Sequence, residues 1–174
     1  MSTMLALAAI TGALKSVLTD DFIGSQAQEF LGELEVSALP PDLISAGDIT
    51  KPRLNLFLYQ VTPNVAWRNM PPVTDAAGRH TGNMPLALDA HYLVTAYGVG
   101  ATDFEMEMLL GYAVDRLHHT SLLSRELIQH KLKAEMPPIK PLTPDNWNAL
   151  REARLDEQME NIRLTPVPMS TDDL

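Results

Sequence analysis

The segment from Leu54 to Val61 constrains the fold more than any other, because it is apolar on both of its sides. An extended chain alternates its side chains between two faces. Here one face carries Leu54, Leu56 and Leu58, and the other carries Phe57, Tyr59 and Val61. Strands that are apolar on both faces occur inside sheets that are covered on both sides. The pattern therefore predicts a central strand with both faces buried.

A second strand is expected from Leu86 to Tyr97, where apolar and mixed positions alternate. The apolar face consists of Leu86, Leu88, Ala90, Tyr92, Val94 and Ala96. The opposite face includes Asp89 and His91 and is expected to be partly solvated. Two weaker strands are predicted, one from Leu31 to Leu39, with Glu33, Glu35 and Ser37 outward, and one near Ile162 and Leu164, which Pro166 and Pro168 would confine to a sheet edge.

Helical periodicity marks both ends of the chain. From Met4 to Leu18, apolar residues recur every three or four positions and leave Thr11 and Lys15 beside the stripe. Thr102 to Glu105 has the spacing of a capping box, and the buried stripe expected to follow it is Met106, Leu109, Leu110, Ala113 and Leu117.

Further helices are predicted from Ser121 to Lys133 and from Pro144 to about Leu155. Helices and strands in this order indicate an α/β or α+β fold with a mixed central sheet flanked by helices. The 174 residues suit a single domain spanning residues 1–174. A helix-start pattern at Ser170 to Asp173 leads us to expect a further C-terminal element.

Composition excludes several classes of function. A formal net charge of −9 opposes binding to phosphate backbones, so no nucleic-acid partner is predicted. The absence of Cys removes disulfides, thiolate catalysis and thiolate zinc sites. Neither a signal peptide nor a membrane span is apparent in the N-terminal residues, so no membrane partner is predicted.

Residues 62–85 separate the two strong strands and are rich in Pro and Gly. A connector of this length without regular structure is usually functional or disordered. It carries Trp67, Arg68 and Asn69, and aromatic and guanidinium side chains often anchor protein interfaces. We therefore interpret this connector as a contact arm, with Trp67 folded back onto its own domain as the alternative.

Three patterns resemble chemical sites only in part. Asp89 and His91 share a strand face, where a carboxylate could orient an imidazole, but no serine nucleophile motif accompanies them. His118 and His119 diverge on a helix and lack a metal-ligand motif. Gly98-Val99-Gly100 begins like a dinucleotide-binding turn, yet Asp103 stands where that turn requires Gly. We predict no catalytic residue, cofactor or metal.

Four blocks of sequence resemble one bacterial family, the N-terminal domain of cap proteins from extracellular contractile injection systems. The first runs from Leu54 to Asn64 and continues through Trp67-Arg68-Asn69. The others are Pro85 to Tyr97, Leu109 to Ala113 with Leu117-His118, and Asn161 to Pro166. His119-Thr120-Ser121 departs from the turn expected there.

The resemblance implies a structural protein with a tail-terminator-like fold. It would form a ring, with six subunits expected, at the end of the sheath and inner tube away from the baseplate. Its partners would be its own copies, sheath subunits and inner tube subunits. The interface candidates are Asn64, Trp67, Arg68 and Asn69 in the arm and Arg163 and Leu164 at the C-terminal edge.

Such a protein would be assembled in the bacterial cytoplasm, as part of a particle that can be released from the cell. Two alternatives stay open at this point. One is a phage tail-terminator or head-tail connector, which has the same mechanical role in another particle. The other is a small cytoplasmic hydrolase that uses Asp89 and His91.

Overall fold

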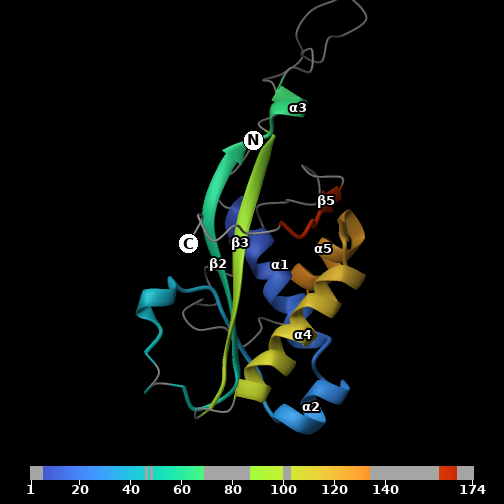
Figure 1. The fold of residues 1–174 in the computed structure, drawn as a ribbon. Helices are drawn as coiled ribbons and strands as arrows, with labels where there is room; N and C mark the ends of the chain where they lie inside the picture. The colour runs from blue at the N-terminus through green and yellow to red at the C-terminus, as the bar shows by residue number, and fades with distance from the viewer. Residues whose placement is uncertain are drawn as a thin grey trace, which may run out of the picture.

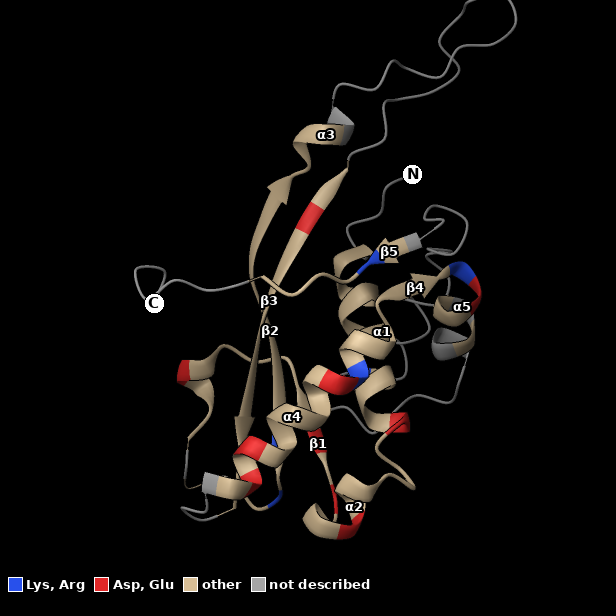
Figure 2. Ribbon diagram, turned by 45° about the vertical axis from the view of Figure 1, so that its right-hand side comes forward, with Lys and Arg blue, Asp and Glu red and all other residues tan. Residues whose placement is uncertain are grey.

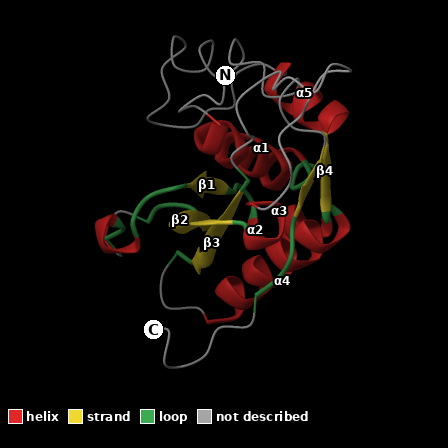
Figure 3. Ribbon diagram, turned by 90° about the horizontal axis from the view of Figure 1, so that it is seen from above, coloured by secondary structure: helices red, strands yellow, loops and turns green. Residues whose placement is uncertain are grey.

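A computed structural model describes residues 6–45, 47, 49–68, 87–99, 103–133 and 161–167. These residues form a mixed three-stranded sheet, a separate two-stranded sheet and helices packed against them. Figures 1 and 3 show α1, α4 and α5 on the same side of the larger sheet. The predicted α+β class, with a mixed sheet and flanking helices, is confirmed. The predicted helix from Pro144 to Leu155 lies outside the described residues.

The larger sheet has the order β1-β2-β3, with β2 in the middle as predicted. β1 (Glu35–Ser37) pairs in parallel with the start of β2 (Arg53–Pro63), and β3 (Leu88–Tyr97) pairs antiparallel with all of β2. The expectation that both faces of β2 are covered holds only at the start of the strand, where Leu54, Asn55 and Leu56 are buried. Of the described helices, α1 and α4 pack against β2. Beyond Leu56 the strand is half-buried or exposed, with Tyr59 44% exposed.

A polar residue of this strand, Asn55, is fully buried beside Ser37. Asn55 Oδ1 accepts hydrogen bonds from Ser37 Oγ at 2.8 Å and from the Leu39 N–H at 2.9 Å. Asn55 Nδ2 donates to the Leu39 carbonyl at 2.9 Å. The prediction that Ser37 faces outward with Glu33 and Glu35 is therefore wrong, because its hydroxyl has a buried acceptor.

Helix α1 (Ala6–Asp20) is confirmed, but it is buried around most of its circumference. It contacts β1, β2, α4 and α5, so few positions remain for solvent. Lys15, predicted to lie beside the buried stripe, is only 4% exposed. Thr11 lies on the side of α1 that faces the sheet, and its Oγ1 is 2.7 Å from the hydroxyl oxygen of Tyr92 in β3.

A short helix, α2 (Gln26–Leu31), occupies a segment for which no helix was predicted. Ser25 caps it by accepting a hydrogen bond from the Gln28 N–H. Gly32 ends it at a φ of 75°, a left-handed conformation that favours glycine. Leu31 therefore belongs to this helix, and the predicted strand shortens to β1, whose end precedes η1 (Pro41–Leu43).

Helix α4 (Asp103–His119) packs against the sheet through fewer apolar residues than predicted. Leu109 and Ala113 are fully buried, as expected. Leu110 was predicted to be buried but is 41% exposed, because it lies on the outward side of the helix. Tyr112 takes its place in the core.

The predicted helix from Ser121 to Lys133 begins later than expected. Its first part is β4 (Leu122–Ser124), and the helix α5 (Arg125–Lys133) follows with Ser124 Oγ accepting from the Leu127 N–H. β4 pairs with β5 (Asn161–Arg163), the strand predicted near the C-terminus. Pairing with a distant segment thus converts the helix start into a strand.

Tyr112 links α4 to the end of α1. Its hydroxyl donates to the Leu18 carbonyl at 2.8 Å, one of the last carbonyls of α1 that the helix itself leaves without a partner. Its ring packs edge-on against Phe22, with centroids 5.2 Å apart. Burial raises the pKa of the Tyr112 hydroxyl.

We expect Tyr112→Phe to lower the free energy of unfolding by about 1 kcal/mol, because the ring packing stays and one buried hydrogen bond is lost. Urea denaturation monitored by circular dichroism measures this change. Tyr112→Leu, which also removes the ring contact with Phe22, should cost more. Equal stability of Tyr112→Phe and wild type would show that the hydroxyl contributes nothing.

Candidate functional site

The far end of the β2–β3 hairpin projects beyond the helices and carries α3 (Val65–Arg68) (Figures 1 and 2). We call residues 60–64 and 87–91 the hairpin tip. It is closed by Asn64, whose N–H donates to the Ala87 carbonyl at 3.0 Å. This end corresponds to the start of the predicted contact arm.

An irregularity in pairing sets which side chains share a face of the hairpin tip. Leu58 pairs with Tyr92 and Gln60 pairs with His91, so Tyr59 is an extra residue in β2. After it, Val61 pairs with Ala90 and Pro63 with Leu88. Directly paired residues of antiparallel strands share a face, so these four continue the face that the helices cover lower down.

The prediction that Val61 shares a face with Phe57 and Tyr59 is therefore wrong. The extra residue shifts the alternation by one position. As a result, the hairpin tip presents an apolar face to the surroundings, with Val61 39% and Leu88 40% exposed.

The opposite face of the hairpin tip is polar and internally hydrogen-bonded. Asn64 Nδ2 donates to Asp89 Oδ1 at 2.9 Å, and Thr62 Oγ1 lies 3.3 Å from His91 Nε2. The Tyr59 and His91 rings are 6.0 Å apart. His91 thus engages Thr62 of β2, and Asp89 engages Asn64 just after the end of β2; both contacts brace the two strands against each other.

The hairpin tip also has open strand edges. β1 pairs with Arg53, Leu54 and Asn55 only, so the later part of β2 has no strand beside it on that edge among the described residues. The outer edge of β3 is likewise unpaired within the described part of the chain. Open edges present N–H and C=O groups that can pair with another chain.

The predicted interface residues fall in two separate places. Asn64 closes the hairpin tip, and Trp67 and Arg68 lie in α3 just beyond it, although their side chains are not described. Asn69 lies outside the described residues. Arg163 is exposed in the separate β4–β5 sheet, while the neighbouring Leu164 is half-buried against the core and donates its N–H to the Ser121 carbonyl. Their part in an interface stays a prediction.

Other candidate sites from the sequence have local structural explanations. His119 Nδ1 lies 2.8 Å from the Asp115 carbonyl of the preceding helical turn. Gly98 lies close to α4, where an added Cβ would be 3.2 Å from Met106 Cγ, so a larger residue there would need the Met106 side chain to shift. Gly100 and Thr102 lie outside the described residues.

Among the described residues, no group of three or more His, Asp or Glu side chains is arranged to hold a metal ion. A search of the same residues also finds no helix with the length and apolar character needed to cross a membrane.

Sequence reasoning missed the apolar face of the hairpin tip, since nothing in residues 54–63 marks Tyr59 as an extra residue. The position of a bulge depends on the partner strand, which a local pattern does not contain. A usable signal was present in β3, where Leu88 and Ala90 continue the alternation of Tyr92 and Val94 beyond the helices.

The fold and this surface define a class: an α+β domain with a projecting hairpin that exposes an apolar face. The chain belongs to the Pvc16 N-terminal domain family, whose model matches residues 9–174. This family is associated with phage-tail-like contractile injection systems, and the protein is thus a structural protein related to these systems. No curated protein matches the chain, and no solved structure matches it.

Proposed function

We propose that this protein is the cap subunit of a contractile injection particle, which ends polymerisation of the inner tube and sheath and stabilises their distal end. Its copies would form a ring of six, seated on the last tube and sheath layers. The observation that carries the proposal is the exposed apolar face of the hairpin tip, formed by Val61, Pro63, Leu88 and Ala90.

This face supports an assembly role because an apolar hairpin face that stands alone in water needs another surface to cover it. A two-stranded hairpin is only marginally stable in water unless a further strand or a packed surface covers its apolar side. The hairpin tip extends past the helices that cover the same face lower down (Figure 1). A neighbouring subunit that packs there would hold the tip in place.

The open strand edges fit the ending of a polymer. A strand from an adjacent sheath or tube subunit could add beside β2 or β3 through backbone hydrogen bonds. The cap would accept such a strand at one of these edges and would end the polymer by covering the surface on which a further layer would add. Trp67, Arg68 and Asn69 beyond the tip, and Arg163 and Leu164 at the other location, are the side chains we propose for contacts with these partners.

Electron microscopy of particles from cells that lack this protein tests the role. Overlong or unstable sheaths are expected, and particles of normal length and stability would reject the proposal.

Complementation with two neighbouring substitutions then tests the surface. Val61→Glu places a charge on the apolar face and should reproduce the defect, whereas Gln60→Glu places the same charge on the polar face and should restore normal particles. Both positions are exposed, so both variants should fold, which circular dichroism can verify. Normal particles with Val61→Glu would show that the apolar face is not the contact.

A further inference from the structure

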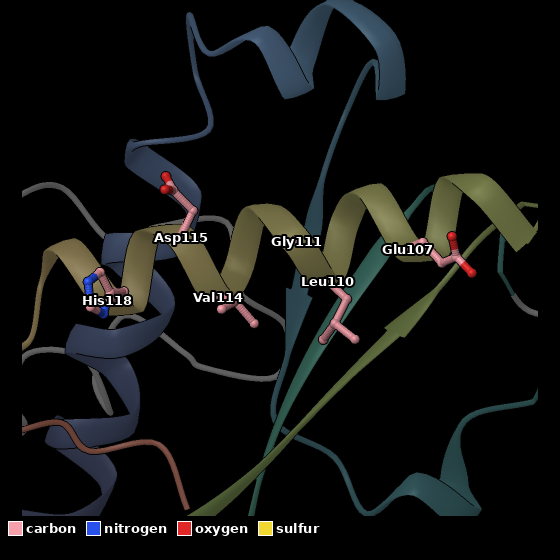
Figure 4. A pocket seen from close by; sticks show the side chains of 6 residues that line it. All are labelled: Glu107, Leu110, Gly111, Val114, Asp115 and His118. Atoms are coloured by element: carbon pink, nitrogen blue, oxygen red, sulfur yellow. The ribbon is translucent and has the colours of Figure 1, made fainter. Parts of the chain in front are cut away.

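A second surface lies on α4, on the side away from the core. Its residues are Glu107, Leu110, Gly111, Val114, Asp115 and His118, which line a shallow hollow and which we call the α4 outer face. Figure 4 shows Leu110 and Val114 projecting from the same side of the helix, with Glu107 and His118 toward its two ends. Val114 is 61% exposed and Leu110 is 41% exposed.

The packing of the described residues does not explain Gly111, which lies at the centre of this face. Glycine in a helix interior is less favourable than alanine by about 1 kcal/mol. A small residue is justified where another part of the fold approaches closely, as at Gly98. At Gly111, however, an added Cβ would meet no atom within 4 Å. The missing side chain thus weakens the helix without serving any contact in the described part of the chain.

Close approach by a helix of another chain would explain a glycine at position 111. Small residues allow the backbones of two helices to approach closely at their crossing point, while apolar neighbours pack around it. Leu110 and Val114 supply those neighbours on α4. An apolar ridge beside a bare backbone position is an arrangement against which a partner helix can pack.

The charges of the face select the chemistry of that helix. Glu107 and Asp115 lie four residues before and four residues after Gly111. Asp115 is 3.6 Å from Arg116 Nε and 3.3 Å from His119 Nδ1, while the Arg116 guanidinium lies over the Tyr112 ring at 5.9 Å from its centroid. Glu107 adds a carboxylate toward one end of the face, in a chain with a net charge of −9. A helix with Lys or Arg beside its apolar stripe is complementary.

The same charges disfavour a second copy of this chain. If two α4 helices crossed antiparallel at Gly111, Glu107 of each would lie opposite Asp115 of the other. Like charges placed opposite each other at an interface oppose association.

We propose that the α4 outer face binds a basic amphipathic helix of a partner chain, with Gly111 as the point of closest approach. This inference does not depend on the capping role, because it concerns a different surface and can be measured on the isolated protein.

Binding of synthetic helical peptides by fluorescence anisotropy tests the proposal. One peptide carries a stripe of Leu around a central Ala, flanked by Lys, and its twin has Glu in place of every Lys. We expect the Lys peptide to bind at least about tenfold more tightly than the Glu peptide. Gly111→Leu, which leaves every charge in place, should weaken binding of the Lys peptide at least about tenfold. Phe30→Ser, which removes an exposed apolar side chain on α2, is the matched control and should bind as wild type does.

Thermal unfolding separates a binding role from a folding role. Gly111→Ala should raise the melting temperature by about 2–4 °C, since Ala favours the helix more than Gly does and its Cβ meets no atom within 4 Å. A lower melting temperature would show that the fold itself needs this glycine and would overturn the proposal. Unchanged peptide binding by Gly111→Leu, or equal binding of the two peptides, would also overturn it. Dimers of the wild type that Gly111→Leu abolishes in sedimentation would identify a second copy as the occupant instead.

Discussion

Replacing Asn55 by Ala should lower the free energy of unfolding by about 3 kcal/mol, because one substitution breaks three hydrogen bonds in a buried site. The side chain is 0% exposed and joins β2 to Ser37 and to both backbone groups of Leu39. Without it, the Ser37 hydroxyl loses its acceptor and the chain leaving β1 loses its attachment to the sheet. Urea denaturation at neutral pH measures the loss.

Two further substitutions test the explanation. Ser37→Ala removes one of the three hydrogen bonds, while Asn55 Oδ1 still accepts from the Leu39 N–H. It should therefore lower the free energy of unfolding by only about 1 kcal/mol. Asn55→Leu fills the volume but restores no polar contact, and it should remain clearly less stable than wild type. An Asn55→Ala protein within about 1 kcal/mol of wild type would contradict this account.

Replacing Lys15 by Met should have the opposite effect and stabilise the protein by about 2–3 kcal/mol at pH 7. Burial lowers the pKa of the Lys15 ammonium from 10.5 to about 8, although the Glu35 carboxylate partly opposes the shift. At pH 7 the folded protein therefore holds a poorly solvated charge, which Met removes while keeping a chain of similar length. The change should appear as a higher urea midpoint.

The pH dependence gives a second signature. Between about pH 8 and pH 10.5 the unfolded chain holds the Lys15 proton and the folded protein does not, so the wild type should gain stability as pH rises through this range. Lys15→Met should lack this gain. Above about pH 10 both proteins should lose stability, because burial raises the pKa of Tyr92 and Tyr112 while unfolded tyrosines ionise. Lys51→Met, at an exposed lysine, is the control and should keep the gain. A Lys15→Met protein less stable than wild type would refute the prediction.

Local sequence patterns were sufficient to predict two kinds of element: those with a long, regular apolar periodicity and those whose pairing partner is near in sequence. The central strand, the second strand and the helices α1 and α4 follow directly from the apolar spacing. β4 could not be predicted, because Leu122 to Ser124 becomes a strand only by pairing with Asn161 to Arg163, and a local pattern does not contain so distant a partner. The burial of Lys15 likewise depends on how many elements surround α1.

The candidate surfaces were predicted to different extents. Pro and Gly content predicted a contact arm after β2. Asn64 lies at the start of that segment, and the contact role stays a prediction. The apolar face of the hairpin tip required knowledge of the pairing at Tyr59. The α4 outer face was not predicted, because Leu110 has the spacing of a core residue. Helical periodicity alone cannot distinguish a buried apolar residue from an exposed one.

The extra residue at Tyr59 also determines where the end of the hairpin is aimed. Deleting it would leave Leu58 and Gln60 opposite the same partners in β3, so the chemical character of each side would be unchanged. Bulges bend a ribbon and increase its twist, however, and the strands beyond this point act as a lever of about 15 Å. A change of direction of about 20° at its base would move its end by about 5 Å. Loss of a single codon would thus redirect the hairpin tip of an otherwise unaltered protein.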